Sequence, residues 1–271
     1  MSYFKKYRCA AVSLVVFLAG MFLGHSFNKI EDRTNNLAKF TDAKNDTGSL
    51  ANRKSVAPVS NDPGAWVNPY TASSPMHKEF DNHRDWVLAN KKLISFAGSS
   101  DPDRLMEVSN QLAGKGVPAL ATNLLEQRLS SLTKIFPSLS AHTCSTFLKG
   151  GFSSSDFMDQ ALPTLDSFSG EEAKAWFVFI KTSIDAALSQ SPLIVLPTED
   201  ATRAVLKITR SLDESRSKAF AAGLMALRTA SDEEVCATVR TLYYKGNALS
   251  EPYRGYMARM LLTGQRGNEK F

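Results

Sequence analysis

The chain has 271 residues, of which 32 are Lys or Arg and 27 are Asp or Glu, so its formal net charge is +5. Three basic residues, Lys5, Lys6 and Arg8, lie at the N-terminus, and without them the net charge is about +2. That near balance gives little support for a nucleic-acid-binding surface. A hydrophobic content of 43% with 16 Phe suffices for one globular core and excludes a wholly disordered chain.

An apolar run near the N-terminus predicts a membrane anchor. Residues 9–27 contain no Asp, Glu, Lys or Arg, and a helix of this length, rising about 1.5 Å per residue, just spans a hydrocarbon core of about 30 Å. Because basic residues precede the run, we expect residues 1–8 to stay in the cytoplasm and the rest of the chain to be exported. A signal peptide cleaved after Ser26 is the main alternative, although Gly24-His25-Ser26 is a poorer site than Ala-x-Ala. A buried core helix is the third possibility.

Residues 28–74 are expected to form a flexible tether. The segment is rich in Asn, Ser, Asp, Thr, Gly and Pro and shows no sustained hydrophobic period. A flexible chain of about 45 residues has a root-mean-square reach of about 35–40 Å. Trp66, Val67 and Tyr70 are exceptions, which we interpret as part of a partly ordered loop; docking on the folded domain or a place at the membrane interface are the alternatives.

The remainder, residues 75–271, is predicted to be a compact all-α domain of about eight to ten helices. Ser74-Pro75 and Asp101-Pro102 each supply an N-cap followed by proline at the first helical position. Glycine and proline mark most of the other boundaries. The helices are expected at residues 75–96, 102–114, 118–136, 140–149, 155–162, 169–188, 199–211, 214–229, 232–245 and 251–263.

Two of these helices are expected to open with the same capping box. Ser169 and Ser231 are each followed three positions later by a glutamate and then by apolar residues at helical spacing. The similarity leaves open a duplicated helical hairpin, although shared capping chemistry alone would produce it. We interpret the acids of both first turns as structural, because they complement the helix macrodipole; they are Glu171, Glu172, Asp232, Glu233 and Glu234.

One run resembles a β-strand. Leu193 to Leu196 are all apolar, and Pro192 and Pro197 bracket them. Since two prolines leave only four residues for pairing, we expect an extended connection packed against the core rather than a strand of a sheet.

The cysteines predict one disulfide. Cys9 lies in the apolar run, whereas Cys144 and Cys236 lie on the exported side, where an oxidising compartment would let them pair. Both fall on the apolar face of their predicted helices. The alternative is that both are small buried hydrophobic residues. No Cys or His spacing is typical of a metal site, so we expect no metal and no cofactor.

A cluster near the C-terminus predicts a protein-binding surface. Arg and Tyr are the residue types enriched at interface hot spots. Half-buried rings and arginines that extend along a helix edge would give the same pattern. The candidate surface consists of Arg240, Tyr243, Tyr244, Tyr253, Arg254, Tyr256 and Arg259. No nucleic-acid partner is expected.

These expectations favour a non-catalytic, single-pass protein of a bacterial inner membrane. Its periplasmic helical domain would be a scaffold or adaptor, an accessory of a secretion or envelope-assembly machine. This layout resembles that of bacterial envelope accessory proteins, in architecture alone. The alternative is an exported all-α hydrolase acting on the cell wall, which would need a carboxyl group with a raised pKa in a cleft.

Overall fold

The computed structural model describes residues 67–265. The predicted cytoplasmic tail (1–8), the signal-anchor (9–27) and residues 28–66 of the tether lie outside this range, as do residues 266–271. Among the described helices, none combines the length and the apolar character needed to cross a bilayer.

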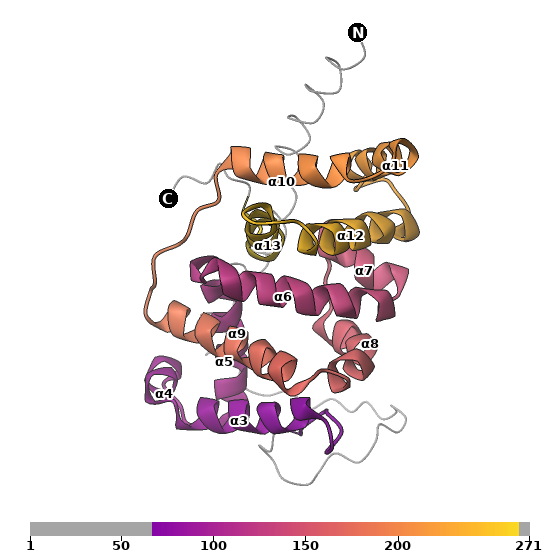
Figure 1. The fold of residues 1–271 in the computed structure, drawn as a ribbon. Coiled ribbons are helices and arrows are strands. Elements are labelled where there is room, and N and C mark those ends of the chain that lie inside the picture. The colour runs from indigo at the N-terminus through magenta and orange to yellow at the C-terminus, as the bar shows by residue number, and fades with distance from the viewer. Residues whose placement is uncertain (1–66, 266–271) are drawn as a thin grey trace, which may run out of the picture.

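Residues 67–265 form an all-α fold in which helices are joined by loops and no β-strand occurs, which confirms the predicted fold class of the domain (Figure 1). Between residues 67 and 265 there are eleven α-helices, against the eight to ten expected for the domain. They are α3 (Pro75–Ala89), α4 (Lys91–Ala97), α5 (Pro102–Gly116), α6 (Thr122–Ile135), α7 (Ala141–Lys149), α8 (Ser154–Asp166), α9 (Gly170–Leu188), α10 (Thr198–Arg210), α11 (Glu214–Met225), α12 (Asp232–Asn247) and α13 (Tyr253–Thr263), with short 3-10 turns η1 (Val117–Ala119) and η2 (Phe136–Ser138).

Several helix boundaries differ from the expectation: α6 begins at Thr122 rather than at residue 118, and α11 ends at Met225 rather than at residue 229. Two further differences have a clear physical reason. The predicted helix at residues 75–96 is two helices, because the side chain of Asn90 accepts hydrogen bonds from the backbone of Lys92 and Leu93 and starts α4 there. Helix α8 continues through Pro163 to Asp166 instead of ending at residue 162. The extra turn buries Leu165 completely, and this burial offsets the backbone hydrogen bond that proline cannot donate.

The helices pack in pairs that are distant in sequence. Helix α5 lies along α9, α7 along α12, and α13 along α6, which runs through the middle of the molecule (Figure 1). Gly116 permits the closest approach, since a Cβ there would lie 1.8 Å from the backbone oxygen of Ser183 in α9. One large core fills the space around α6, α9 and α12, and a smaller cluster lies beneath α3, α4 and α5.

Both predicted capping boxes are present. At Ser169 and again at Ser231, the side chain accepts a hydrogen bond from the backbone of the third helical residue, and that glutamate bonds back to the backbone of the serine. The two boxes start α9 and α12, which carry much of the core. The local chemistry of these starts was therefore readable from the sequence.

The last residues of the predicted tether pack on the domain. The ring of Tyr70 is only 7% exposed and lies edge-on to Phe80 and Phe177, with centroids 6.0 and 6.4 Å away. Thr71 donates to the carboxylate of Asp166 from its backbone N–H (3.1 Å) and its hydroxyl (2.6 Å). Val67, by contrast, is exposed. The folded unit therefore includes residues that precede its first helix.

Candidate functional site

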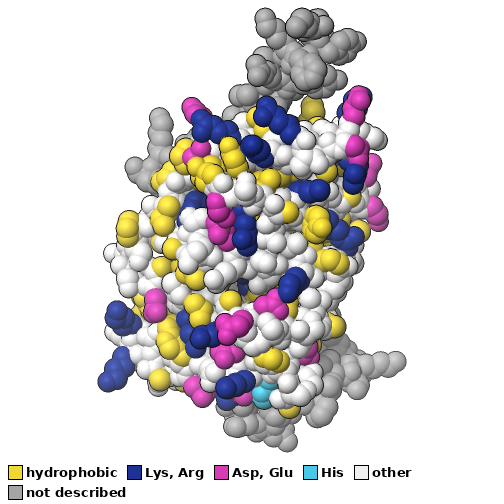
Figure 2. Space-filling view, in the orientation of Figure 1, with side chains coloured by type: hydrophobic (Ala, Val, Ile, Leu, Met, Phe, Trp, Pro, Cys, Tyr) yellow, Lys and Arg dark blue, Asp and Glu magenta, His cyan; other side chains and the backbone are white. Residues whose placement is uncertain are grey.

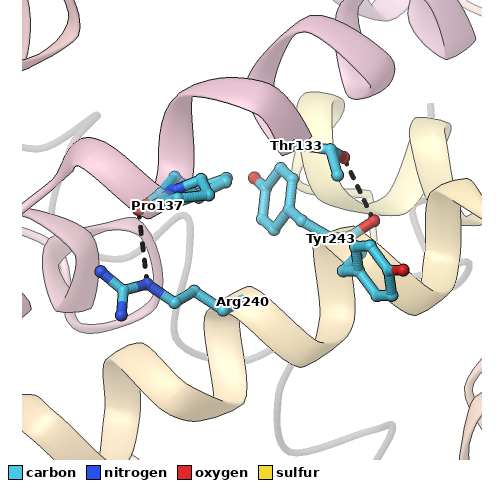
Figure 3. Close-up of a pocket in the computed structure, with 6 residues that line it drawn as sticks. Thr133, Pro137, Arg240 and Tyr243 are labelled. Carbon is cyan, nitrogen blue, oxygen red and sulfur yellow. Dashed lines mark hydrogen bonds between the residues drawn. The ribbon is translucent and has the colours of Figure 1, made fainter.

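A shallow pocket lies where the end of α6 and η2 meet α12 (Figure 3). Its volume is about 250 Å³, and it is lined by Thr133, Phe136, Pro137, Arg240, Tyr243 and Tyr244. The hydroxyl of Thr133 donates to the backbone oxygen of Tyr243 at 3.3 Å, so α6 and α12 are joined at the pocket wall. The side chain of Tyr244 is 64% exposed and stands at the edge.

Arg240 is held in a fixed position beside this pocket. Its Nε donates to the backbone oxygen of Phe136 at 3.3 Å, and its Nη2 donates to that of Leu139 at 2.8 Å. These carbonyls belong to the end of α6 and η2, where a helix leaves backbone acceptors without partners in the helix. The guanidinium group therefore supplies the oxygen of Leu139 with a donor and that of Phe136 with a second donor beside the N–H of Leu139, and it stays on the pocket wall while its residue remains exposed.

Aromatic rings line the floor of the pocket and continue beyond it. The ring of Phe136 lies 4.3 Å from that of Tyr243 and 4.7 Å from that of Phe147, centroid to centroid. Phe147 in turn lies 5.2 Å from Phe152, which is exposed in the turn after α7. Two of these pairs, Phe136–Phe147 and Phe147–Phe152, are edge-on and the third is tilted, and edge-on rings at such separations contribute attraction beyond the burial of their area.

The structure divides the seven residues of the predicted partner surface. Two are buried, and of these Tyr243 contributes only to the floor of the pocket: Tyr243 and Arg259. Two are exposed beside the pocket: Arg240 and Tyr244. Three are half-buried on α13: Tyr253, Arg254 and Tyr256. Helical spacing alone could not separate these groups, because the faces of α12 and α13 that point inward depend on their packing against α6 and α10.

Arg259 holds backbone segments together inside the domain. Although only 3% exposed, its guanidinium donates to the backbone oxygens of Pro118 (3.2 Å), Ile194 (3.3 Å) and Leu120 (2.7 Å) and to the hydroxyl of Thr122 (3.2 Å). Burial lowers the pKa of this arginine from its usual value. The side chain thus joins the start of α6 to the loop between α9 and α10.

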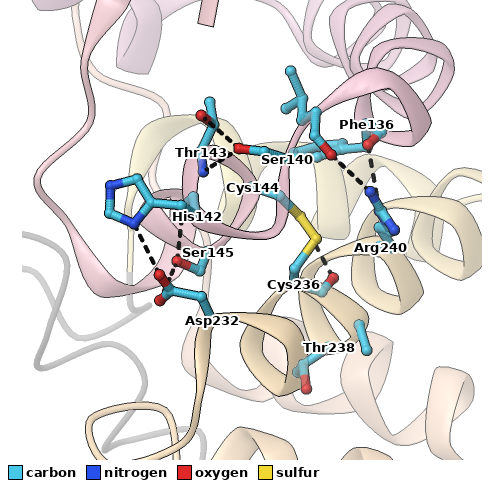
Figure 4. The surroundings of a disulfide bond; sticks show 12 residues. Phe136, Ser140, His142, Thr143, Cys144, Ser145, Asp232, Cys236, Thr238 and Arg240 are labelled. Atoms are coloured by element: carbon cyan, nitrogen blue, oxygen red, sulfur yellow. Dashed lines mark hydrogen bonds and ion pairs between the residues drawn. A yellow bond between two sulfur atoms is a disulfide. The ribbon is translucent and has the colours of Figure 1, made fainter. Parts of the chain in front are cut away.

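The predicted disulfide is present. Cys144 in α7 and Cys236 in α12 are bonded, and their Cα atoms lie 5.2 Å apart (Figure 4). Both residues are buried, as their positions on the apolar faces of the two helices indicated. The bond lies one helix turn away from Arg240, so it fixes the helix that carries the pocket wall.

A carboxylate next to the disulfide joins the same two helices. Asp232, in the first turn of α12, accepts hydrogen bonds at 2.8 Å from the hydroxyl of Ser145 and from Lys149 Nζ, and its second oxygen lies 2.8 Å from His142 Nδ1 (Figure 4). These partners hold the pKa of the carboxyl well below its usual range, with Lys149 the largest influence. From the sequence we had expected Asp232 only to stabilise the start of its own helix. The polar stripe on α7, at steps of three and four, was the signal that it missed.

A second missed feature is a buried guanidinium. The central carbon of Arg128 lies 3.2 Å from the centroid of the Trp176 ring, and burial lowers the pKa of the arginine to about 9. Its Nη1 has no hydrogen-bond partner among residues 67–265. Arg128 follows Leu124 and Leu125 at helical spacing on the core face of α6, and this position was the available signal. The contact is a cation–π interaction inside the core.

One pair of carboxyl groups has perturbed chemistry. Glu126 in α6 is hydrogen-bonded to Glu251, and burial and the charge of Glu251 raise the pKa of Glu126, against the opposing charge of Arg254. The two acids meet above Gly255, where a Cβ would lie 2.9 Å from Glu126 Oε1. The pair lies close to the starts of α6 and α13.

Charges of both signs are mixed on the face in Figure 2, and the described residues hold no metal-ligand cluster. Figure 2 shows Lys and Arg interspersed with Asp and Glu over one face, with hydrophobic side chains between them. Residues 67–265 contain no group of three or more His, Cys, Asp or Glu placed to hold a metal ion. His83 is stacked on Trp86, and burial lowers its pKa to about 4.

Comparison of the chain with models of known families, with curated proteins and with solved structures finds no match.

Proposed function

We propose that the chain is a single-pass protein of a bacterial inner membrane, with its helical domain in the periplasm serving as a scaffold or adaptor for a protein partner. The apolar run at residues 9–27 and the basic residues before it support the anchor and its direction. The disulfide between Cys144 and Cys236 supports the location, because such bonds persist in oxidising compartments.

The observation that carries the adaptor proposal is the pairing of Arg240 with Tyr244 at the pocket. Tyr244 presents a ring that is 64% exposed, and such rings anchor interfaces at small entropic cost. Two N–H groups of Arg240 bond to backbone oxygens, which leaves the remaining donors of the guanidinium for a partner. A pocket of about 250 Å³ has room for one side chain of that partner, packed on Phe136 and Pro137.

Site-specific photocrosslinking in intact cells tests this proposal. A photoreactive amino acid replaces Tyr244 in the full chain, and Lys174, which is exposed on α9 and is not among the residues that line the pocket, is the matched control position. We expect a discrete crosslinked product from position 244 that is absent from position 174. The added substitution Arg240→Ala should remove most of it. Identical products from both positions, or a product that Arg240→Ala leaves unchanged, would contradict the adaptor role of this surface.

The exported hydrolase remains the second candidate, and Glu126 is the observation in its favour. A carboxyl group with a raised pKa beside a second carboxylate is the arrangement that general acid–base catalysis requires. Purified full chain can be assayed for release of soluble fragments from isolated cell wall, with Glu126→Gln as the comparison. Release that depends on Glu126 would favour the hydrolase; equal background release by both proteins would reject it.

A further inference from the structure

The connection between α9 and α10 presents an unusual surface. It runs along the left edge of the molecule in Figure 1, outside the packed helices. Within it, Leu193, Ile194 and Val195 are 43%, 41% and 46% exposed, whereas Leu196 is buried. Three consecutive large apolar side chains are thus half in solvent on a segment that the sequence analysis expected to pack against the core.

One backbone edge of this segment is held firmly by the domain. The N–H of Ile194 donates to the oxygen of Pro118 at 3.2 Å. The buried amide of Gln265 donates through Nε2 to the oxygen of Ile194 at 2.8 Å and accepts from the N–H of Leu196 at 2.6 Å. The N–H and C=O of one residue in a neighbouring parallel strand bond to the C=O of residue i and the N–H of residue i+2 in a similar way. The side chain of Gln265, together with Arg259, therefore fixes residues 194–196 in an extended conformation.

The opposite backbone edge is free. In an extended strand, the N–H and C=O groups of alternate residues point to opposite edges. The groups of Leu193 and Val195 therefore point away from the edge that Ile194 and Leu196 use. Within residues 67–265, the two N–H groups and two C=O groups of Leu193 and Val195 have no hydrogen-bond partner. Such an edge is a template for another strand.

We propose that this edge pairs with the same edge of a second copy of the chain, antiparallel, about a two-fold axis through Ile194. In this register Leu193 lies opposite Val195 of the second copy, and the two residues exchange both N–H···O bonds. Symmetry repeats the exchange, so all four free groups of each copy are satisfied. Ile194 faces its own counterpart as the non-hydrogen-bonded pair, in agreement with the inward direction of its backbone groups.

The sequence around the edge favours a second copy as the occupant. Residues 189–198 contain no charged side chain, so two copies meet without like-charge repulsion. Pro192 and Pro197 cannot donate a backbone hydrogen bond, which limits pairing to the short run between them, and a second copy has that same length. A two-fold contact also closes on itself, so the pair cannot grow into a filament.

The contact is small. The contact consists of four hydrogen bonds in total and of three apolar side chains from each copy. A contact of this size buries less than the roughly 1,200 Å² that stable interfaces bury, so the dimer is weak and reversible. The inference does not depend on the proposed function, because the edge lies in the connection between α9 and α10 rather than at the pocket on α12.

Disulfide trapping in the purified full chain tests the register. In a Cys9→Ser background, Ile194→Cys places two thiols at a pair whose Cα atoms lie about 4.5 Å apart, within disulfide range. Leu193→Cys is the matched control, because position 193 and its counterpart lie about 8 Å apart, beyond that range. We expect mild oxidation to give a covalent dimer from the Ile194→Cys variant and several-fold less from the Leu193→Cys variant.

A third variant separates strand pairing from mere proximity. Val195→Pro, added to Ile194→Cys, removes a free N–H without breaking any hydrogen bond that the described residues make. The trapped dimer should fall roughly ten-fold, since one bond is lost on each side of the axis, while circular dichroism shows unchanged helix content. Equal trapping at positions 193 and 194, no trapping at 194, or trapping that Val195→Pro leaves unchanged would each overturn the proposal.

Discussion

Cys144 and Cys236 are 92 positions apart in the sequence, yet their Cα atoms lie 5.2 Å apart and their sulfur atoms are bonded. The bond ties α7 to α12, two helices that also share the carboxylate of Asp232. Arg240 and Tyr244 extend from α12 beyond this double attachment. The position of the proposed partner surface is therefore set by a covalent bond and a polar cluster together.

Removal of the disulfide should destabilise the domain strongly. A closed loop of this length is worth at most about 4.5 kcal/mol in the chain-entropy model, and measured effects are smaller, so we expect a loss of about 2–4 kcal/mol for Cys144→Ser. Thermal melting followed by circular dichroism measures the change, and a reductant should lower the melting temperature of the parent protein to a similar extent. A reductant that lowers the melting temperature of the Cys144→Ser variant equally would contradict this explanation.

Asp232→Asn should lower the melting temperature at neutral pH. The folded-state pKa of Asp232 is lowered, so its contribution to stability is fully present above the unfolded-state value near 4 and is lost as the pH falls toward the folded-state pKa. The two proteins should therefore differ at pH 7 and converge as the pH drops below about 4. Melting curves at pH 7, 5 and 3 check this. A difference in melting temperature between the two proteins that grows as the pH falls would contradict the stabilising role of the ionised carboxylate.

Replacement of Arg259 should be among the most harmful single substitutions. Arg259→Met leaves the buried backbone oxygen of Leu120 without its donor, at a cost of about 1–3 kcal/mol, and removes one of two donors from the backbone oxygens of Pro118 and Ile194. We expect a loss of at least about 3 kcal/mol in denaturant unfolding, at the high end for point substitutions. Arg259→Lys keeps the charge with fewer donors, so its free energy of unfolding should lie between those of the parent and of Arg259→Met. A loss below about 0.5 kcal/mol for Arg259→Met would show that the three segments hold together without it.

Tyr70 should behave as a core residue although it precedes the first helix. Tyr70→Ala removes a buried ring from its contacts with Phe80 and Phe177 and should cost about 3 kcal/mol. Tyr70→Phe keeps the ring and should change stability by less than about 0.5 kcal/mol. Denaturant unfolding of both variants measures the pair. Equal stability of the alanine variant and the parent would place residues 68–74 outside the folded unit.

The secondary structure was largely readable from the sequence because its signals are local. Caps such as Ser169 and Ser231 specify a helix start within four residues. The break at Asn90 is local too, but asparagine in a helix-like stretch signals a new N-cap only when the chain already bends there. The helix end predicted at Pro163 is wrong because its signal is overridden by packing: burial of Leu165 stabilises the last turn of α8, which follows the proline.

The candidate site was only partly predictable, because burial is a property of the whole fold. The spacing of Tyr243 and Tyr244 shows that they face different directions, but which one points inward depends on α6. The pairing of the cysteines needed one assumption, an oxidising compartment, since only two lie within the predicted domain. The hydrogen bonds of Arg259 bridge segments some 65 to 141 positions away, which no local pattern encodes.

Protease accessibility tests the central claim, an exported domain on a retained anchor, most directly. The full chain with a C-terminal epitope is expressed in a Gram-negative host, and intact cells are compared with spheroplasts after protease treatment. The account predicts an epitope that is protected in intact cells, degraded in spheroplasts and recovered with the membrane fraction before digestion. An epitope that stays protected in spheroplasts, or that is released in soluble form when the outer membrane is opened, would contradict it.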